Sequence, residues 1–250
     1  MKMKKKTKCG TKKKILIALV SIIAVIILLC GVCLVFVLDC YKADMDAINS
    51  FATENEVDYT TDGAYTVFAP EGASVGLIFY PGAKVEHEAY LPLMEACADK
   101  GILCVLVEMP MYFPLIGSGL AEGVCEMFPN IDKWYIGGHS LGGYSASMYL
   151  EKNLDKFEGL ILLASYTASD FSNKDIDALA IYGTEDKIMN RERYNEGLAL
   201  LPNDYTELVI EGGCHAFFAM YNGQDIADAK GITNEEQIFA TAEAIAEFVK

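Results

Sequence analysis

The sequence is short of histidine and proline and has no internal repeat, and each shortage excludes a class of protein. Its 7 prolines and 21 glycines follow no period, so the chain is neither a collagen nor a repeat array. A hydrophobic content of 52% is too high for a disordered chain. The 3 histidines and 8 cysteines show no zinc-ligand spacing, and the pair Cys30-x-x-Cys33 falls within an apolar run. A length of 250 residues favours one compact domain with one appended segment.

Charge is distributed unevenly along the chain. Eight of the 20 basic residues are lysines within the first 14 positions, and no acidic residue precedes Asp39. The remaining 12 basic residues accompany all 35 acidic ones. Because so acidic a body would repel a phosphate backbone, we expect no nucleic-acid partner.

Residues 15–38 form a run of 24 residues without a charge or a proline. As a helix the run would be about 36 Å long, enough to cross a hydrocarbon core of about 30 Å. A cleaved signal peptide is the alternative, but no small-x-small cleavage site follows the run. Because the lysines precede it, the positive-inside rule predicts a cytoplasmic tail at 1–14, a single transmembrane helix in the cell membrane and an extracytoplasmic body. For residues 39–56 we predict a juxtamembrane stalk with a short helix.

Only half of the cysteines belong to the predicted body. Cys104 lies inside an apolar run, which favours a buried structural thiol. A disulfide remains an open alternative among the four, which are Cys97, Cys104, Cys125 and Cys214.

Residues 57–250 alternate between apolar strand patterns and helical patterns. This alternation predicts a three-layer α/β fold with a doubly wound, mostly parallel sheet covered by helices on both faces. Two weaker runs, 57–60 and 64–68, predict an antiparallel hairpin at the leading edge of the sheet. Ligands of such sheets bind beyond the carboxyl ends of the strands, so the loops there are where chemistry is expected. The longer strands are predicted at 75–80, 102–107, 134–136, 160–163, 179–182 and 206–210, and the helices at 88–100, 118–128, 142–154, 191–201 and 234–249.

A glycine-rich turn follows the strand expected at 134–136. The sequence Gly138-His-Ser-Leu-Gly142 places a serine between two glycines, after a strand and before a helix. This is the context of a nucleophile elbow, in which glycines let a sharp turn close so that the serine hydroxyl projects at the edge of the sheet. Ser140 is therefore the candidate nucleophile.

A serine nucleophile needs a base, and the three histidines are the candidates. His139 belongs to the elbow, where we expect its side chain to point away from the hydroxyl and to pack. His87 lies in a charged stretch and is typical of an exposed residue at the start of a helix. His215 follows the strand expected at 206–210 and is the predicted base, because the order serine, acid, histidine is the one expected for this elbow.

The acid of such a triad is expected after the strand at 179–182. Asp186 is the candidate that orients His215 and stabilises its charged form. Glu185 is the alternative, and an acid at this place can also serve only as a helix N-cap.

An oxyanion hole needs two backbone N–H groups beside the nucleophile. Leu141 supplies one at the start of the helix that follows the elbow. The tight turn Tyr80-Pro-Gly-Ala83 follows the first long strand, and Ala83 is the second candidate donor, while Gly82 can instead serve only the turn.

These motifs resemble the α/β-hydrolase superfamily, in particular compact serine hydrolases similar to dienelactone hydrolases. The resemblance covers roughly residues 57–250. Dienelactone hydrolases use a cysteine where Ser140 stands here, which favours a serine branch of the superfamily. The segments that carry the resemblance are Tyr80-Pro-Gly-Ala83, Gly138-His-Ser-Leu-Gly142, Gly183-Thr-Glu-Asp186 and Gly213-Cys-His215-Ala-Phe-Phe218.

The resemblance implies an esterase that cleaves a small acyl ester through an acyl-enzyme intermediate, with no metal or organic cofactor. Only residues 164–178 lie where many relatives carry a helical cap, so we expect an open site without a large lid. Residues 109–116, Tyr166 and residues 217–221 are candidate walls of an acyl pocket, and the segment 109–116 can equally pack on neighbouring helices. Two other functions stay open: acyl transfer by the same triad, and a catalytically silent domain that binds a partner at the cell surface. Nothing in the sequence indicates an oligomeric state.

Overall fold

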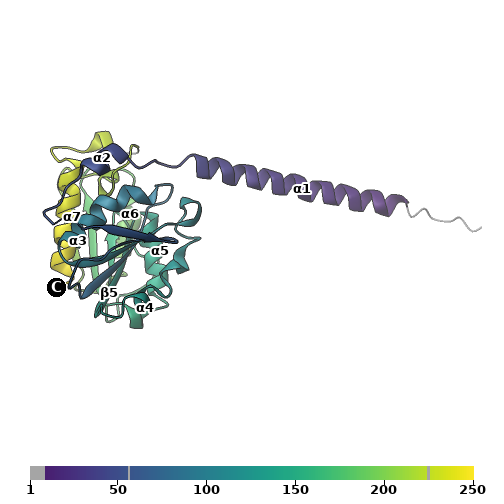
Figure 1. The fold of residues 1–250 in the computed structure, drawn as a ribbon. Coiled ribbons are helices and arrows are strands. Elements are labelled where there is room, and N and C mark those ends of the chain that lie inside the picture. The colour runs from purple at the N-terminus through teal and green to yellow at the C-terminus, as the bar shows by residue number, and fades with distance from the viewer. Residues whose placement is uncertain (1–8, 56, 224–225) are drawn as a thin grey trace, which may run out of the picture. The chain divides into compact units, whose positions relative to one another are not determined.

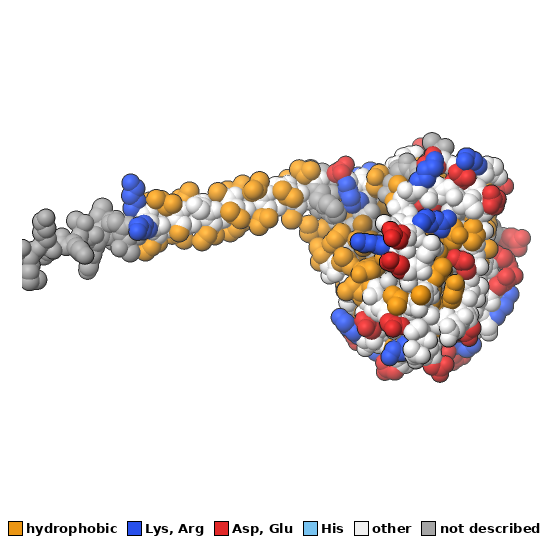
Figure 2. Space-filling view, turned by 180° about the vertical axis from the view of Figure 1, so that it is seen from behind, with side chains coloured by type: hydrophobic (Ala, Val, Ile, Leu, Met, Phe, Trp, Pro, Cys, Tyr) orange, Lys and Arg blue, Asp and Glu red, His pale blue; other side chains and the backbone are white. Residues whose placement is uncertain are grey.

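The computed structural model describes residues 9–55, 57–223 and 226–250, and the chain divides into two units at Cys40. The first unit is one helix, α1 (Cys9–Leu38) (Figure 1). Its segment Lys13–Val35 has a mean hydropathy of 3.3 and no buried part, and Figure 2 shows hydrophobic side chains along its length. Such a helix is long and apolar enough to cross a membrane, and a signal sequence has the same properties. Residues 1–8 of the predicted tail lie outside the described residues.

The second unit, Tyr41–Lys250, is built around one eight-stranded sheet in the order β1-β2-β4-β3-β5-β6-β7-β8. Strands β3 to β8 are parallel, and β1 and β2 form a hairpin that joins β4 in the antiparallel sense. The predicted mostly parallel sheet and its leading hairpin are confirmed. The strands are β1 (Tyr59–Asp62), β2 (Tyr65–Phe68), β3 (Val75–Tyr80), β4 (Ile102–Val107), β5 (Lys133–His139), β6 (Gly159–Leu163), β7 (Asp177–Gly183) and β8 (Thr206–Ile210).

Helices cover both faces of this sheet. Helices α3 (Leu91–Asp99) and α7 (Asn234–Phe248) pack together on one face, while α5 (Leu141–Leu150) packs on β3, β5 and β6 from the other (Figure 1). Because both faces are covered, every residue of β4 is buried, which explains its unbroken apolar sequence. The helix α6 (Arg191–Leu198) follows β7.

The segment 118–128, predicted as one helix, is divided in two. A 3-10 turn at Ser118–Ala121 precedes the short helix α4 (Val124–Met127), and Gly123 between them has a φ of 81°. A right-handed helix cannot continue through that conformation, so the glycine ends the first piece before the second begins.

The segment 39–56, predicted as a stalk, contains the expected short helix, α2 (Met45–Ser50). From Tyr41 onward, however, the chain belongs to the globular unit. Tyr41 forms a bridge with Val85, and Phe51 is buried and stacks on Phe239 with ring centroids 5.0 Å apart. Burial of apolar surface therefore holds this segment against the body.

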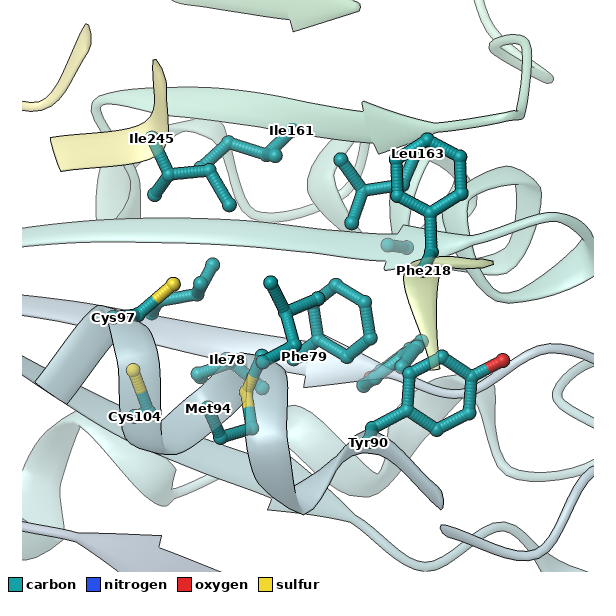
Figure 3. Close-up of a cluster of buried hydrophobic side chains, with 14 of the residues drawn as sticks. Ile78, Phe79, Tyr90, Met94, Cys97, Cys104, Ile161, Leu163, Phe218 and Ile245 are labelled. Carbon is teal, nitrogen blue, oxygen red and sulfur yellow. The ribbon is translucent and has the colours of Figure 1, made fainter. Parts of the chain in front are cut away.

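The core lies on both faces of the sheet, under helices α3 and α7 on one side and under α5 on the other. Figure 3 shows buried side chains of this core, among them Ile78 and Phe79 of β3, Met94 of α3 and Ile245 of α7. Cys97 and Cys104 are buried in the same cluster. The four cysteines of the globular unit form no disulfide with one another, so the open alternative of a disulfide among them is not realised in the structure.

Candidate active site

The elbow joins the end of β5 to the start of α5. Ser140 stands between them with φ 52° and ψ −125°, a conformation that a residue with a side chain adopts only under strain. A Cβ atom on Gly138 would collide with the backbone oxygen of Tyr80, and one on Gly142 with the backbone oxygens of Tyr80 and Pro81. Both glycines of the motif are therefore required by the close approach of the turn after β3.

Two hydrogen bonds hold the elbow in place from the neighbouring strand. The N–H of Ser140 donates to the backbone oxygen of Leu163 at 2.9 Å, and the Ser165 hydroxyl donates to the backbone oxygen of Ser140 at 2.6 Å. Ser165 was not predicted from the sequence. Its role depends on the pairing of β5 with β6, which no local motif reveals.

The predicted acid and base meet at the same edge of the sheet. His215 Nδ1 lies 2.9 Å from Asp186 Oδ2, and both side chains are almost completely buried. Asp186 Oδ1 accepts hydrogen bonds from the N–H groups of Ile188 and Met189, at 2.9 and 2.8 Å. Glu185, the alternative acid, instead forms an ion pair with Lys230 at 2.7 Å.

Asp186 is ionised in this environment. Burial by itself would raise its pKa, but the hydrogen bond from His215 and those from the backbone outweigh burial and lower the pKa below its usual value. Because an ionised carboxylate only accepts hydrogen bonds, His215 Nδ1 must donate. The other ring nitrogen, Nε2, is then left as the proton acceptor of the imidazole.

A cavity of about 400 Å³ opens over these residues, and both Ser140 and His215 line it. No hydrogen bond joins the two side chains in the described part of the chain, and such bonds are often long before substrate binds. Of the predicted pocket walls, Tyr166 lines the cavity, whereas residues 109–116 and 217–221 do not. The other lining residues are Leu141, Tyr144, Ala164, Ser165, Ile188, Met189, Asn190 and Arg193.

The two predicted oxyanion donors are the N–H groups of Leu141 and Ala83, and neither has a hydrogen-bond acceptor within the described ranges. Leu141 is the first residue of α5, where a helical N–H has no intrahelical partner. The N–H of Ala83 is also without an acceptor there, while the N–H of Gly82 donates to the Tyr90 hydroxyl at 2.9 Å. Gly82 therefore serves the turn.

Tyr90 and His139 form a buried link beneath this turn. The Tyr90 oxygen accepts the Gly82 N–H and lies 2.7 Å from His139 Nδ1. Burial raises the pKa of Tyr90, so the hydroxyl keeps its proton and donates it to His139. Burial lowers the pKa of His139, which remains a neutral acceptor. One path of hydrogen bonds thus joins the turn after β3 to the residue before the nucleophile.

His139 also contacts the predicted base. The ring centroids of His139 and His215 are 4.5 Å apart, and Phe218 lies 5.6 Å from His139 on the same side. His139 is thus buried and packed, as the sequence predicted, and it supports the His215 ring directly. His87, the third histidine, begins a 3-10 turn next to Glu88 and lies apart from the cavity lining.

The described residues contain no group of three or more histidine, cysteine, aspartate or glutamate side chains that could hold a metal ion.

The arrangement of strands, elbow and acid agrees with the family comparison. The model of the alpha/beta hydrolase family matches residues 76–239, and the chain belongs to that family. Membership supports a hydrolase with a small-molecule substrate. Among curated protein sequences, none matches the chain.

Solved structures with the same fold cover the globular unit. TT1662 from Thermus thermophilus has a TM-score of 0.57 at 15% identity, and Est1E from Butyrivibrio proteoclasticus has 0.56 at 14%. A dienelactone hydrolase from Anabaena variabilis has 0.57 at 13%. Each alignment covers 78% of this chain and 97%, 99% and 97% of the respective structure. At these identities the likeness concerns the fold alone.

Proposed function

We propose that this chain is a membrane-anchored serine hydrolase that cleaves carboxylic esters with Ser140, His215 and Asp186. The observation that carries the proposal is the buried hydrogen bond between His215 and Asp186 at the cavity that also holds the strained Ser140. A domain used only for binding does not need a buried carboxylate that is hydrogen-bonded to a histidine beside the cavity.

The first half of the reaction transfers the acyl group to the enzyme. Ser140 Oγ attacks the ester carbonyl carbon while His215 Nε2 accepts the hydroxyl proton. Asp186 stays ionised and stabilises the imidazolium that forms. When the tetrahedral intermediate collapses, the bond to the alcohol oxygen breaks and that oxygen takes the proton from His215.

The second half returns the enzyme to its starting state. Water attacks the acyl carbon and gives a proton to His215, and the bond to Ser140 then breaks as His215 returns that proton to Oγ. In both halves the carbonyl oxygen becomes negative, and the N–H groups of Ala83 and Leu141 are the proposed donors to it. No step calls for a metal or an organic cofactor.

The segment between β6 and β7, which contributes to the cavity lining, leaves room for a small substrate to enter. Only residues 164–176 join β6 to β7, and the structure describes no helix among them. A helical cap is therefore absent from that described stretch, and the substrate reaches Ser140 from solvent through an open cavity.

The anchor is proposed from α1 and the charge pattern. A helix whose segment Lys13–Val35 has a mean hydropathy of 3.3 is suited to a bilayer core. The lysines before it and the acidic residues after it favour an N-terminus in the cytoplasm and a catalytic unit outside. Protease added to intact cells should then digest the globular unit and spare the lysine tail, and full protection of the globular unit would contradict this orientation.

A fluorophosphonate probe tests the catalytic proposal, because it reacts with activated serines. The wild-type protein should be labelled, Ser140→Ala should not, and His215→Ala should be labelled far more slowly. Hydrolysis of p-nitrophenyl acetate should fall with triad removal by as much as about a million-fold. Folded wild-type protein that is neither labelled nor active on short esters would favour the silent binding domain. Product formation only when an acceptor alcohol is added would favour the acyltransferase.

A further inference from the structure

An apolar surface loop lies between Glu108 and Glu122, a stretch without a single charged residue. We call residues 109–121 the apolar loop. The side chains of Met111, Leu115 and Ile116 are 40%, 36% and 60% exposed. In a unit as rich in acidic residues as this one, three large apolar side chains exposed on one uncharged loop indicate a contact outside the folded chain.

The inner side of the apolar loop is fixed to the catalytic unit. The Ser145 hydroxyl of α5 donates to the backbone oxygen of Pro114 at 2.9 Å, and the Tyr80 hydroxyl donates to that of Ser118 at 2.7 Å. These bonds hold the backbone, so the apolar side chains cannot turn inward without breaking them. Met111 and Tyr112 both have a φ of 54°, a strained conformation that the fold retains here.

The apolar loop is bonded to the place where the chain enters the globular unit. The backbone oxygen of Tyr112 accepts the N–H of Lys84 at 2.8 Å, and the backbone oxygen of Lys84 accepts the N–H of Tyr41 at 2.6 Å. The Lys42 ammonium lies 5.9 Å from the centre of the Tyr112 ring. The apolar loop and the first residues of the unit are therefore neighbours.

Only Asp39 and Cys40 separate Tyr41 from the end of α1 at Leu38. Three residue steps span at most about 11 Å even when extended. If α1 crosses the bilayer, Tyr41 is held within that distance of the end of α1, which itself lies three residues beyond the apolar segment Lys13–Val35. The apolar loop, which is bonded to Tyr41 through Lys84, is then kept within reach of the lipid headgroups.

We propose that the apolar loop docks on the lipid bilayer, with Met111, Leu115 and Ile116 inserted at the boundary between headgroups and acyl chains. This proposal rests on the proposed anchor and is independent of the chemistry at Ser140. Insertion at this depth is typical of apolar side chains that flank an anchor. Because the apolar loop follows β4 at the same edge of the sheet as the elbow, docking also turns the cavity edge toward the membrane surface.

Tryptophan fluorescence in the full chain tests the docking. The protein, reconstituted in phosphatidylcholine vesicles, is compared as Ile116→Trp and as the control Met127→Trp, whose native side chain is 48% exposed. The natural Trp134 is buried in both and gives a common background. Vesicles made with brominated phosphatidylcholine should quench the tryptophan at 116 and shift its emission to shorter wavelength, and should leave the one at 127 unchanged.

Each outcome bears on a separate claim. Equal quenching at 116 and 127, whether strong or absent, overturns the docking of the apolar loop while the anchor stands. Release of the wild-type protein from vesicles by alkaline carbonate would contradict the proposed anchor, and the docking of the apolar loop would fall with it. Fluorophosphonate labelling of Ser140 in the same samples reports on the catalytic proposal alone, and circular dichroism confirms that both variants are folded.

Discussion

Replacing Tyr90 by phenylalanine would remove the one oxygen atom that joins the turn after β3 to the elbow. That oxygen accepts the Gly82 N–H at 2.9 Å and lies 2.7 Å from its acceptor, His139 Nδ1. In Tyr90→Phe both partners stay buried and lose their hydrogen bond. Each unpaired buried group costs about 1–3 kcal/mol, so for the two groups we expect the free energy of unfolding to fall by about 2–6 kcal/mol.

The same substitution should lower kcat more than it changes KM. Gly82 precedes Ala83, whose N–H is a proposed oxyanion donor, and without the Tyr90 hydroxyl the turn can shift. Complete loss of one donor typically costs a factor of about 100 to 1,000 in kcat. A displaced donor keeps part of its effect, so we expect a loss of about tenfold in kcat with a nearly unchanged KM.

Urea unfolding and steady-state hydrolysis of p-nitrophenyl acetate measure the two effects. The matched control is Tyr194→Phe, because Tyr194 is also buried and its hydroxyl donates to Glu207 at 2.7 Å, while its side chain does not line the cavity. We expect the control to lose stability and to keep kcat. If Tyr90→Phe kept the kcat of the control, the Tyr90 hydroxyl would stabilise the fold without positioning the oxyanion turn.

Three further predictions concern the elbow and the acid. Gly142→Ala should abolish fluorophosphonate labelling and lower the melting temperature, because its Cβ meets two backbone oxygens, whereas Gly119→Ala, with open space around it, should do neither. Asp186→Asn should lower kcat by about 10,000-fold in ester hydrolysis, since His215 Nδ1 loses its acceptor. The folded-state pKa of Asp186 is lowered, so its contribution to stability is present above about pH 4 and is lost as the pH falls through the folded pKa. Asp186→Asn should therefore lose less stability between pH 7 and pH 3 in urea unfolding than the wild type, and an unchanged acid dependence would contradict this assignment.

The parts of the site that the sequence could predict follow either from a local motif or from the rule that parallel strands end at one edge of the sheet. The elbow needs two glycines around Ser140 in a strand-turn-helix context, and that requirement is visible in five consecutive residues. Asp186 and His215 follow from their places after the strands β7 and β8, because parallel strands end at one edge of the sheet.

The parts that the sequence could not predict depend on which strands are neighbours. Ser165 supports the elbow because β6 pairs with β5, and Tyr90 reaches His139 across 49 positions of the chain. A serine after a strand or a tyrosine before a helix carries no local signal of such a role. The same holds for Phe51 in the segment predicted as a stalk, because its aromatic ring is buried and stacks on Phe239.

Three of the four cysteines of the globular unit are buried. Eight cysteines can form a disulfide scaffold, yet the four in the globular unit form no disulfide with one another. Burial raises the pKa of Cys104 well above its usual value and that of Cys125 to about 11. Because the thiolate is the form that is oxidised, the raised pKa of these two thiols lowers their reactivity while the unit stays folded. The sheet, covered on both faces, thus shields Cys104 completely from solvent.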